Sequence, residues 1–302
     1  MNQANTGVPR IPALNFHVWQ PCNMGCKYCF ASFEDTRASL RLAKPALKQR
    51  ALAVIQGAAN AGIKKITFVG GEPTLCPWLG ELLDQSKRFG MVTMLVTNGT
   101  RLRNDWLRIH GSSIDWIALS VDSLDSQVNE QIGRVSSGRA ATADFYNELV
   151  DRVRVHGCRL KINTVVSSRN WHEDLTSFIR RCNPERWKIF QALHVLGEND
   201  VAFPEFAVTA AQFNSFVARH KAFEAIWAVE HEQAMLGSYL MVDPLGRFFT
   251  NASGSYACSD PIWAVGWEHA LAQVDVDYAK FRNRGGLYDW GESGLSPTRR
   301  GD

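Results

Sequence analysis

The chain has 302 residues, a formal net charge of +3 and a hydrophobic content of 45%. This length and composition predict one large or two small folded domains with a sizeable core. The weak net charge argues against a protein that wraps nucleic acid. No apolar run reaches the roughly 18 residues of a membrane span, and no signal-peptide core is present. We therefore expect a cytoplasmic protein without nucleic-acid or membrane partners.

Strand-like apolar runs alternate with helix-length segments along the first two thirds of the chain. These runs are residues 14–19, 65–70, 92–97, 114–121, 160–166 and 186–195. Between the first two lies KPALKQRALAVIQGAANAG, with Pro45 near its start and Gly62 at its end, as is typical of a helix. Strands separated by helices predict a parallel α/β sheet. In such folds the catalytic loops follow the C-terminal ends of the strands.

The same alternation predicts three regions. Residues 1–13 form an N-terminal segment that we expect to be flexible, and residues 14–230 contain the α/β unit. From about residue 231 to residue 302 the alternation fades, which indicates a C-terminal extension that closes over the sheet and ends in a flexible tail.

Three cysteines directly follow the first predicted strand. Cys22, Cys26 and Cys29 have the spacing C-x3-C-x2-C. Iron–sulfur clusters usually take four cysteine thiolates, so a triad leaves one corner of a four-iron cluster for another ligand. Structural zinc sites usually need four ligands, and nothing nearby completes such a set, although open zinc sites can use three. We expect a [4Fe-4S] cluster, with zinc as the alternative. The other four cysteines are expected to be reduced thiols.

A glycine-rich segment, Gly70-Gly71-Glu72-Pro73, follows the second predicted strand. Glycines allow the backbone to approach a ligand closely. The strand-end carbonyls and Glu72 are suited to hold an ammonium group. An ordinary turn is the alternative.

Basic and polar side chains recur on one face of several predicted strands. Because successive side chains alternate between faces, shared faces are expected for the sets Lys65/Thr67/Val69, Trp116/Ala118/Ser120, Lys161/Asn163/Val165 and Arg186/Lys188/Phe190. A buried lysine is unfavourable unless it is paired, so several together predict an anionic ligand. Their number matches a triphosphate. The alternative is that each is a solvent-exposed charge at a strand end.

Taken together, these motifs resemble the viperin family of antiviral radical S-adenosylmethionine enzymes. The matching segments follow in order between about residues 14 and 290: NFHVWQPCNMGCKYCF, KKITFVGGEP, TNGT, ALSVDSLDSQVNEQIGR, KINTVV, NPERWKIFQ, GEND, ARHK, SYL and RGGLY. The resemblance implies a partial (β/α)6 TIM-type barrel with a C-terminal extension. It also implies a [4Fe-4S] cluster and S-adenosylmethionine as cofactors.

The resemblance further implies a reaction. A 5′-deoxyadenosyl radical would take the 4′ hydrogen of a ribonucleoside triphosphate, with CTP or UTP favoured. Loss of the 3′-hydroxyl would then give the 3′-deoxy-3′,4′-didehydro nucleotide, an antiviral chain terminator. A low-potential electron donor of the flavodoxin or ferredoxin type and the iron–sulfur assembly machinery are the implied protein partners. A radical enzyme acting on a peptide or cofactor precursor, and a non-catalytic iron–sulfur sensor, remain as alternatives.

Residue roles follow from the motifs that match. The cofactor-binding residues implied are Gly70, Gly71, Glu72, Asn98, Ser120 and Val165. The substrate-binding residues implied are Asn15, Lys65, Arg134, Lys161, Asn163, Arg186 and Lys188, of which Lys65 and Lys161 are also expected to be catalytic. For Asn98 the alternative is an ordinary turn, and for Arg134 a surface charge. Gln191 falls on the opposite strand face and is a weak candidate.

Overall fold

A single curved sheet organises the described part of the chain, which comprises residues 11–33, 36 and 44–291 of a computed structural model. Its strand order is β12-β11-β10-β1-β2-β3-β4-β7-β8-β9. The strands are β1 (Ala13–Trp19), β2 (Lys65–Gly70), β3 (Val92–Thr97), β4 (Trp116–Ser120), β7 (Arg159–Val166), β8 (Arg186–Gln191), β9 (Trp227–Glu230), β10 (Met241–Val242), β11 (Arg247–Thr250) and β12 (Ala257–Pro261). In this order, each pair of neighbours from β10 through β1 to β9 is parallel. Within this sheet, β11 is antiparallel to its neighbours, β10 and β12.

All six predicted strands are present in this sheet, in parallel as expected. The sequence analysis missed four others, because β9 to β12 are only two to five residues long and too short to show an alternating pattern. It also missed a small hairpin formed by β5 (Val135–Ser136) and β6 (Arg139–Ala140). The predicted run 186–195 was too long, since β8 ends at Gln191.

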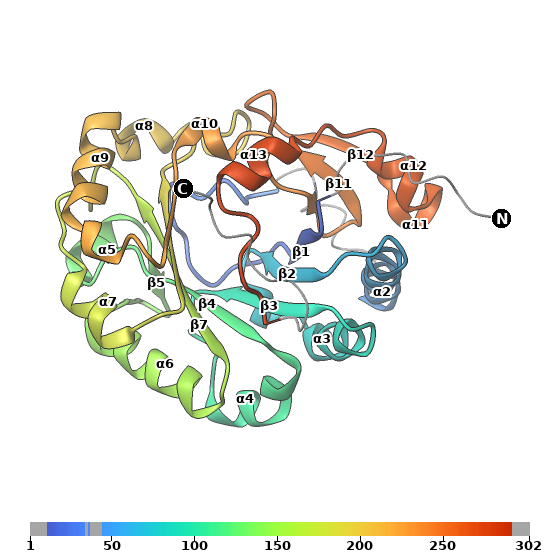
Figure 1. The fold of residues 1–302 in the computed structure, drawn as a ribbon, viewed down its shortest axis with the longest axis horizontal. Helices are drawn as coiled ribbons and strands as arrows, with labels where there is room; N and C mark the ends of the chain where they lie inside the picture. The colour runs from blue at the N-terminus through green and yellow to red at the C-terminus, as the bar shows by residue number, and fades with distance from the viewer. Residues whose placement is uncertain (1–10, 34–35, 37–43, 292–302) are drawn as a thin grey trace, which may run out of the picture.

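Most helices lie outside the arc of the sheet, whereas α10 and α13 each contribute a residue to the cavity on its inner face (Figure 1). The described α-helices are α2 (Lys44–Asn60), α3 (Leu79–Arg88), α4 (Asn104–His110), α5 (Ser126–Gln131), α6 (Ala143–Val155), α7 (Thr176–Cys182), α8 (Phe203–Phe206), α9 (Ala210–Arg219), α10 (Glu232–Met235), α11 (Ile262–Val265), α12 (Trp267–Leu271) and α13 (Tyr278–Asn283). Helix α6 illustrates the packing: Tyr146, Leu149, Val150 and Val153 recur at helical spacing and are all buried. None of the described helices has the length and apolarity needed to cross a membrane.

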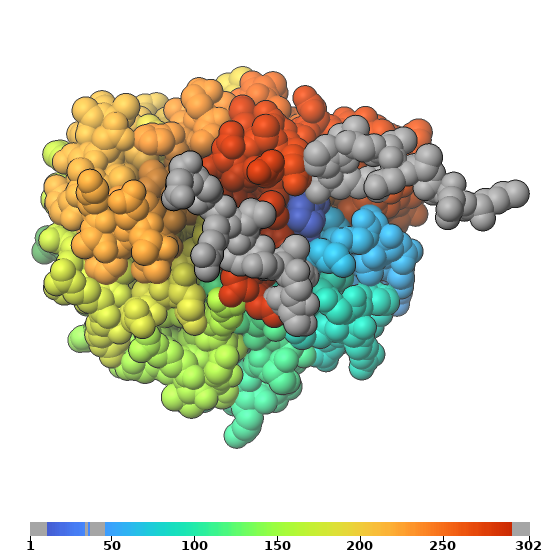
Figure 2. Space-filling view, viewed as in Figure 1, coloured from blue at the N-terminus to red at the C-terminus, as the bar shows by residue number. Residues whose placement is uncertain are grey.

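The sheet curves into an arc, so the fold is the expected partial TIM-type barrel (Figure 1). The C-terminal segment crosses the open middle of this arc after α13. There the Trp116 indole donates a hydrogen bond to the Trp290 carbonyl oxygen at 3.0 Å. Figure 2 shows the same segment, in red, at the surface between the first and the middle parts of the chain. Most of the N-terminal segment expected to be flexible, and the end of the tail, lie outside the described residues.

Candidate active site

A cavity of about 320 Å³ lies on the inner face of the curved sheet. The strand face predicted from side-chain alternation is the face that lines it. Of the residues nominated from the sequence, these line the cavity: Asn15, Cys22, Cys26, Cys29, Lys65, Gly70, Gly71, Glu72, Asn98, Ser120, Arg134, Lys161, Asn163, Val165 and Lys188. Arg186 does not.

The cavity has two chemically different ends. The cysteine loop leaves the C-terminal end of β1, and Gly70 ends β2. Lys65 is instead the first residue of β2, and Lys161 and Lys188 each lie near the start of β7 and β8. Because these strands are parallel, the thiols gather toward one end of the cavity and the cations toward the other.

The cysteine loop is held by backbone hydrogen bonds to the segment after α5. Gly25 N–H donates to the Gly133 carbonyl at 3.1 Å, and Lys27 N–H donates to the Ile132 carbonyl at 3.0 Å. Gly133 has a φ of +82°, and a Cβ there would lie 2.1 Å from the Gly25 carbonyl oxygen. Glycine is therefore required at this contact, which explains part of the IGR motif.

Cys22, Cys26 and Cys29 all line the cavity and supply three thiols as potential metal ligands. Within the described residues, no three cysteine, histidine or carboxylate side chains converge as the ligands of one metal ion do. Iron–sulfur clusters are held by cysteine thiolates, whereas a structural zinc site takes four ligands around one ion. The donor set fits a cluster better than zinc.

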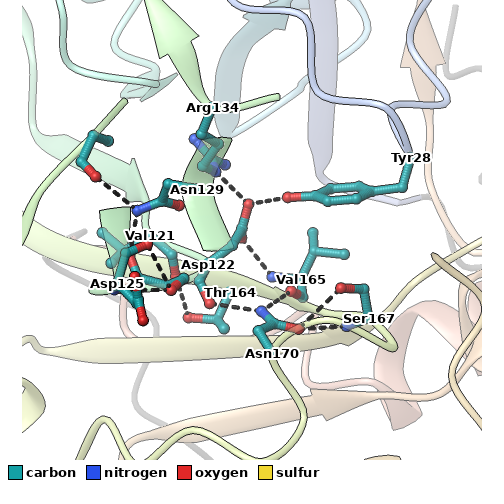
Figure 3. A network of polar contacts seen from close by, with 12 residues as sticks. Tyr28, Val121, Asp122, Asp125, Asn129, Arg134, Thr164, Val165, Ser167 and Asn170 are labelled. Atoms are coloured by element: carbon teal, nitrogen blue, oxygen red, sulfur yellow. Dashed lines mark hydrogen bonds and ion pairs between the residues drawn. The ribbon is translucent and has the colours of Figure 1, made fainter. Parts of the chain in front are cut away.

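A buried network centred on Asp122 joins the cysteine loop to two strands (Figure 3). The Asp122 carboxylate accepts hydrogen bonds from the Tyr28 hydroxyl and the Arg134 guanidinium, and from Val165 N–H at 2.7 Å. Asn170 donates to the carbonyl oxygens of Asp122 and Val165, at 2.6 and 2.9 Å. Arg134 is only 5% exposed, so it is a buried ion-pair partner and not a surface charge.

The glycine segment after β2 packs directly against the chain leaving β1. A Cβ on Gly70 would lie 2.2 Å from the Trp19 carbonyl oxygen, and one on Gly71 would lie 2.0 Å from that of Gln20. No other residue type fits here without moving the backbone. The two glycines therefore allow the second strand to meet the cysteine loop.

Glu72 lines the cavity, but its carboxylate is already bonded. It accepts hydrogen bonds from Thr74 N–H at 3.1 Å, the Thr97 hydroxyl at 2.7 Å and Asn98 N–H at 2.9 Å. Burial raises the pKa of Glu72 despite these bonds. The carboxylate thus ties the glycine segment to the end of β3.

Asn98 and Gln191 are also held by neighbouring groups. The Asn98 side chain donates to the side-chain amide oxygen Oδ1 of Asn23 at 3.0 Å and accepts from Thr100 N–H at 3.0 Å, so it both forms a turn and faces the cysteine loop. Gln191 lines the cavity, but its amide donates to the Val208 carbonyl at 3.3 Å.

Three lysines face the cavity from different strands. Lys65, Lys161 and Lys188 are each 6% exposed. Burial and their mutual repulsion lower the pKa values of Lys65 and Lys161 well below the usual range, and burial lowers that of Lys188 to about 7. Within the described residues, the Lys161 ammonium group makes no hydrogen bond or ion pair. Beside it, Asn163 Oδ1 is buried without a partner. These groups form a buried cluster of basic and polar side chains, in which Asn163 Oδ1 has no hydrogen-bond partner.

Arg186 lies under the C-terminal segment instead of on the cavity wall. Its guanidinium donates to the Gly285 carbonyl at 2.6 Å and stacks 4.0 Å from the centre of the Tyr288 ring. Tyr288 in turn accepts a hydrogen bond from Lys65 at 3.0 Å. Arg186 is therefore connected to the cation cluster through the C-terminal segment.

Several cavity residues received no role from the sequence. Tyr239, Arg284 and Tyr288 line the cavity and belong to the SYL and RGGLY segments, which were recognised only as matching motifs. His17 also lines it, with Nδ1 buried and unpartnered. Asp122 lay in the ALSVDS segment, and the motif match was the signal that could have pointed to it.

Comparison with known proteins places this geometry in a family. The sequence profile of the Radical SAM superfamily matches residues 18–182. The S-adenosylmethionine-dependent nucleotide dehydratase of Flammeovirga pacifica is 43% identical over 96% of this chain and 100% of its own length. The dehydratase of the same name from Lacinutrix mariniflava is 44% identical, and the match covers 95% of this chain but 60% of that protein. The Danio rerio S-adenosylmethionine-dependent nucleotide dehydratase RSAD2 is 32% identical over 94% of this chain and 79% of its own.

Solved structures share the fold at lower identity. Streptococcus suis SuiB bound to precursor peptide SuiA superposes with a TM-score of 0.62 at 18% identity, over 90% of this chain and 66% of that chain. Native anSMEcpe with bound AdoMet superposes with a TM-score of 0.62 at 13% identity, over 90% of this chain and 82% of that chain.

Proposed function

Because the chain belongs to the S-adenosylmethionine-dependent nucleotide dehydratases of the Radical SAM superfamily, we propose that it dehydrates a ribonucleoside triphosphate to the 3′-deoxy-3′,4′-didehydro nucleotide. CTP and UTP are the favoured substrates, by resemblance to the viperin family. The product is lighter than the substrate by one water, and its role would be to terminate viral chains.

One observation carries the choice of a triphosphate. The cations Lys65, Lys161 and Lys188 gather at the end of the cavity opposite the three cysteines. Burial makes these lysines costly in the absence of an anion. A triphosphate bound there would stabilise their charged forms, and its nucleoside would extend toward the cysteine loop.

The residues present fit both cofactors of the family. Cys22, Cys26 and Cys29 would hold the [4Fe-4S] cluster, while Gly70, Gly71 and Asn98 lie beside them for S-adenosylmethionine. When bound, these two groups supply the reductive cleavage that produces a 5′-deoxyadenosyl radical. Ser120 and Val165, at the ends of neighbouring strands, would contact the same cofactor.

The chain's own contribution is to bind, orient and enclose the substrate. Lys65, Lys161 and Lys188 would bind phosphate oxygens, and the unpartnered Asn163 Oδ1 would accept a hydrogen bond from the sugar or base. Asn15 faces the same space from β1. The C-terminal segment around Tyr288 covers the phosphate end and excludes water.

The proposed protein partners are a low-potential flavodoxin or ferredoxin and the iron–sulfur assembly machinery. Both follow from the need to load and reduce a cluster. We place the electron donor at the cysteine end of the cavity, because Cys22 and Cys29 are exposed there.

The test is an anaerobic assay of the reconstituted protein with S-adenosylmethionine, dithionite and one ribonucleoside triphosphate at a time. We expect 5′-deoxyadenosine together with a nucleotide that has lost one water. Deoxyadenosine without a changed nucleotide would refute the substrate. Absence of both from cluster-loaded protein would instead support a sensor.

Two adjacent lysines allow a matched test of the cation cluster. Lys65 is buried in the cavity, whereas its neighbour Lys64 is exposed. K65A is expected to raise the nucleotide KM by about tenfold or more, since a charged hydrogen bond contributes roughly 1.5–3 kcal/mol. K64A should leave the KM unchanged. Equal KM values for K65A and the wild type would contradict the assignment of Lys65.

A further inference from the structure

Glu230, the last residue of β9, is bonded to two of the cations near the nucleotide cavity. Its carboxylate forms ion pairs with Lys188 and with Arg284, the latter at 3.3 Å, and accepts a hydrogen bond from the Tyr239 hydroxyl. Glu230 is 0% exposed, and the side chains of Lys188 and Arg284 are 7% and 6% exposed. These contacts form a closed network behind the cavity wall.

The network joins separate parts of the fold. Lys188 lies on β8 and also donates to the Tyr239 hydroxyl at 2.7 Å. Arg284 follows α13, donates to the Ser238 carbonyl at 3.0 Å, and lies 3.5 Å from the centre of the Tyr239 ring. Glu230 therefore connects a strand of the barrel to the C-terminal segment that covers the cavity.

Charge balance gives Glu230 a particular importance. The interacting cations of this region are Lys65, Lys161, Arg186, Lys188 and Arg284. Within the described residues, Glu230 is the one carboxylate that forms ion pairs with any of them. Removal of its charge would leave two buried cations facing each other without compensation.

The effect is largest at Lys188. Burial, Arg284 and Arg186 lower the pKa of Lys188 and Glu230 raises it, and the net value is about 7. Lys65 and Lys161 add to the repulsion, because each interacts with Lys188. The Tyr239 hydroxyl accepts a hydrogen bond from Lys188. Without Glu230, Lys188 would lose its proton at a lower pH than it does in the wild type.

We propose that Glu230 is a positioning residue for the substrate: it favours the charged form of Lys188 and holds Lys188 and Arg284 together so that both can bind one phosphate group. Glu230 does not touch the substrate itself and acts through these two cations. The identification of the anion as a nucleoside triphosphate rests on the proposed function, whereas the role of Glu230 in anion binding does not.

The probe is inorganic triphosphate, titrated calorimetrically into the cluster-loaded protein and into its E230Q variant. We expect E230Q to bind it about tenfold more weakly near pH 7.5, because a shift of one pKa unit corresponds to tenfold in binding. The loss should grow as the pH rises toward about 7, because only the variant loses the Lys188 proton there, and it should level off above about pH 7, where wild-type Lys188 loses its proton too. Affinity for S-adenosylmethionine should not change.

A double-mutant cycle tests whether Glu230 acts through Lys188. In the K188Q background, E230Q should weaken binding much less than it does in the wild type. D243N is the matched control, because Asp243 is 1% exposed and paired with Arg247 but does not line the cavity. It should leave triphosphate binding unchanged. E230D retains the charge and should bind triphosphate with most of the wild-type affinity. If E230Q fails to fold, E230D is measured in its place.

The possible results separate this proposal from the proposed function. Unchanged or tighter triphosphate binding by E230Q would overturn the role of Glu230, since tighter binding would mean that the carboxylate only competes with the anion. A second result is that the wild type binds triphosphate, E230Q binds it more weakly, and the wild type converts no nucleotide. This would support the role of Glu230 and refute the nucleotide reaction. Full additivity of E230Q and K188Q would also overturn the proposal.

Discussion

Two buried carboxylates of this site, Asp122 and Glu72, already accept hydrogen bonds from other protein groups. Asp122 accepts from Tyr28, Arg134 and Val165, and Glu72 accepts from Thr97 and Asn98. A buried carboxylate without such partners would be strongly destabilising. These acids therefore position the residues around them, and their substitution should first affect the local structure.

Asp122 provides the prediction at this scale. D122N leaves the Arg134 guanidinium buried without its counter-charge, which should lower the free energy of unfolding by about 3 kcal/mol. It should also lower the iron retained per chain, because the Tyr28 hydroxyl loses its carboxylate partner next to Cys29. Urea denaturation and iron analysis of the reconstituted protein measure both effects.

Asp125 supplies the control for this substitution. Its side chain caps α5 by accepting from Gln127 N–H at 2.7 Å. Asparagine caps helices about as well as aspartate, so D125N should change neither quantity. If D122N behaved like D125N, the network of Figure 3 would not support the cysteine loop.

At the scale of elements, the site depends on close backbone contacts between loops. The segment after α5 carries both Gly133, which contacts the cysteine loop, and Arg134, which pairs with Asp122. Gly70 and Gly71 make a similar contact after β2. Each contact is possible only because a Cβ atom is missing, and together they position the cysteine loop.

G133A tests these contacts. The new Cβ would lie 2.1 Å from the Gly25 carbonyl oxygen, so the cysteine loop must move. We expect a loss of iron and a decrease of more than about 2 kcal/mol in the free energy of unfolding. The left-handed conformation alone would cost at most about 2 kcal/mol, and the clash adds to it. Melting temperature and iron content are the measurements.

Gly138 in the β5–β6 hairpin is the matched control for this change. Its φ is +73°, but nothing lies within 4 Å of an added Cβ. G138A should therefore show only the backbone cost, about 1–2 kcal/mol, and normal iron content. Equal iron contents in the two variants would show that the Gly133 contact does not matter for the loop.

At the scale of the whole molecule, two buried histidines link stability to pH. Burial lowers the pKa of His17 to about 3, and burial also lowers that of His220. His220 Nε2 accepts from Leu175 N–H at 2.9 Å, which requires the unprotonated ring nitrogen. The folded protein therefore holds both rings neutral, while the unfolded chain protonates them below about pH 6.5.

The unfolded state then binds more protons, so stability should fall as the pH drops below about 6.5. For His17 alone the expected loss at about pH 5 is roughly 2 kcal/mol relative to neutral pH. In the variant H17F this part of the loss should disappear, since phenylalanine does not titrate. Urea denaturation of both proteins at the two pH values gives the difference, and parallel pH profiles would contradict the assignment.

Local patterns in the sequence were sufficient for much of this protein. The cysteine spacing, the glycine pair after β2 and the two-residue alternation of the strands each depend on neighbours a few residues apart. They predicted a parallel α/β sheet, its six main strands and the strand faces that line the cavity, whereas the partial barrel was implied by the family resemblance. The roles of individual residues were inferred from the resemblance, and they remain predictions.

Only the tertiary structure decided which distant groups meet. It placed Glu230 between Lys188 and Arg284, positioned Arg186 under Gly285 and Tyr288, and engaged the Glu72 carboxylate with Thr97 and Asn98. The physical reason is that these contacts depend on strand register and on the path of the C-terminal segment. Neither leaves a periodic pattern in the chain, and strands of two to five residues such as β9 to β12 are too short to show one.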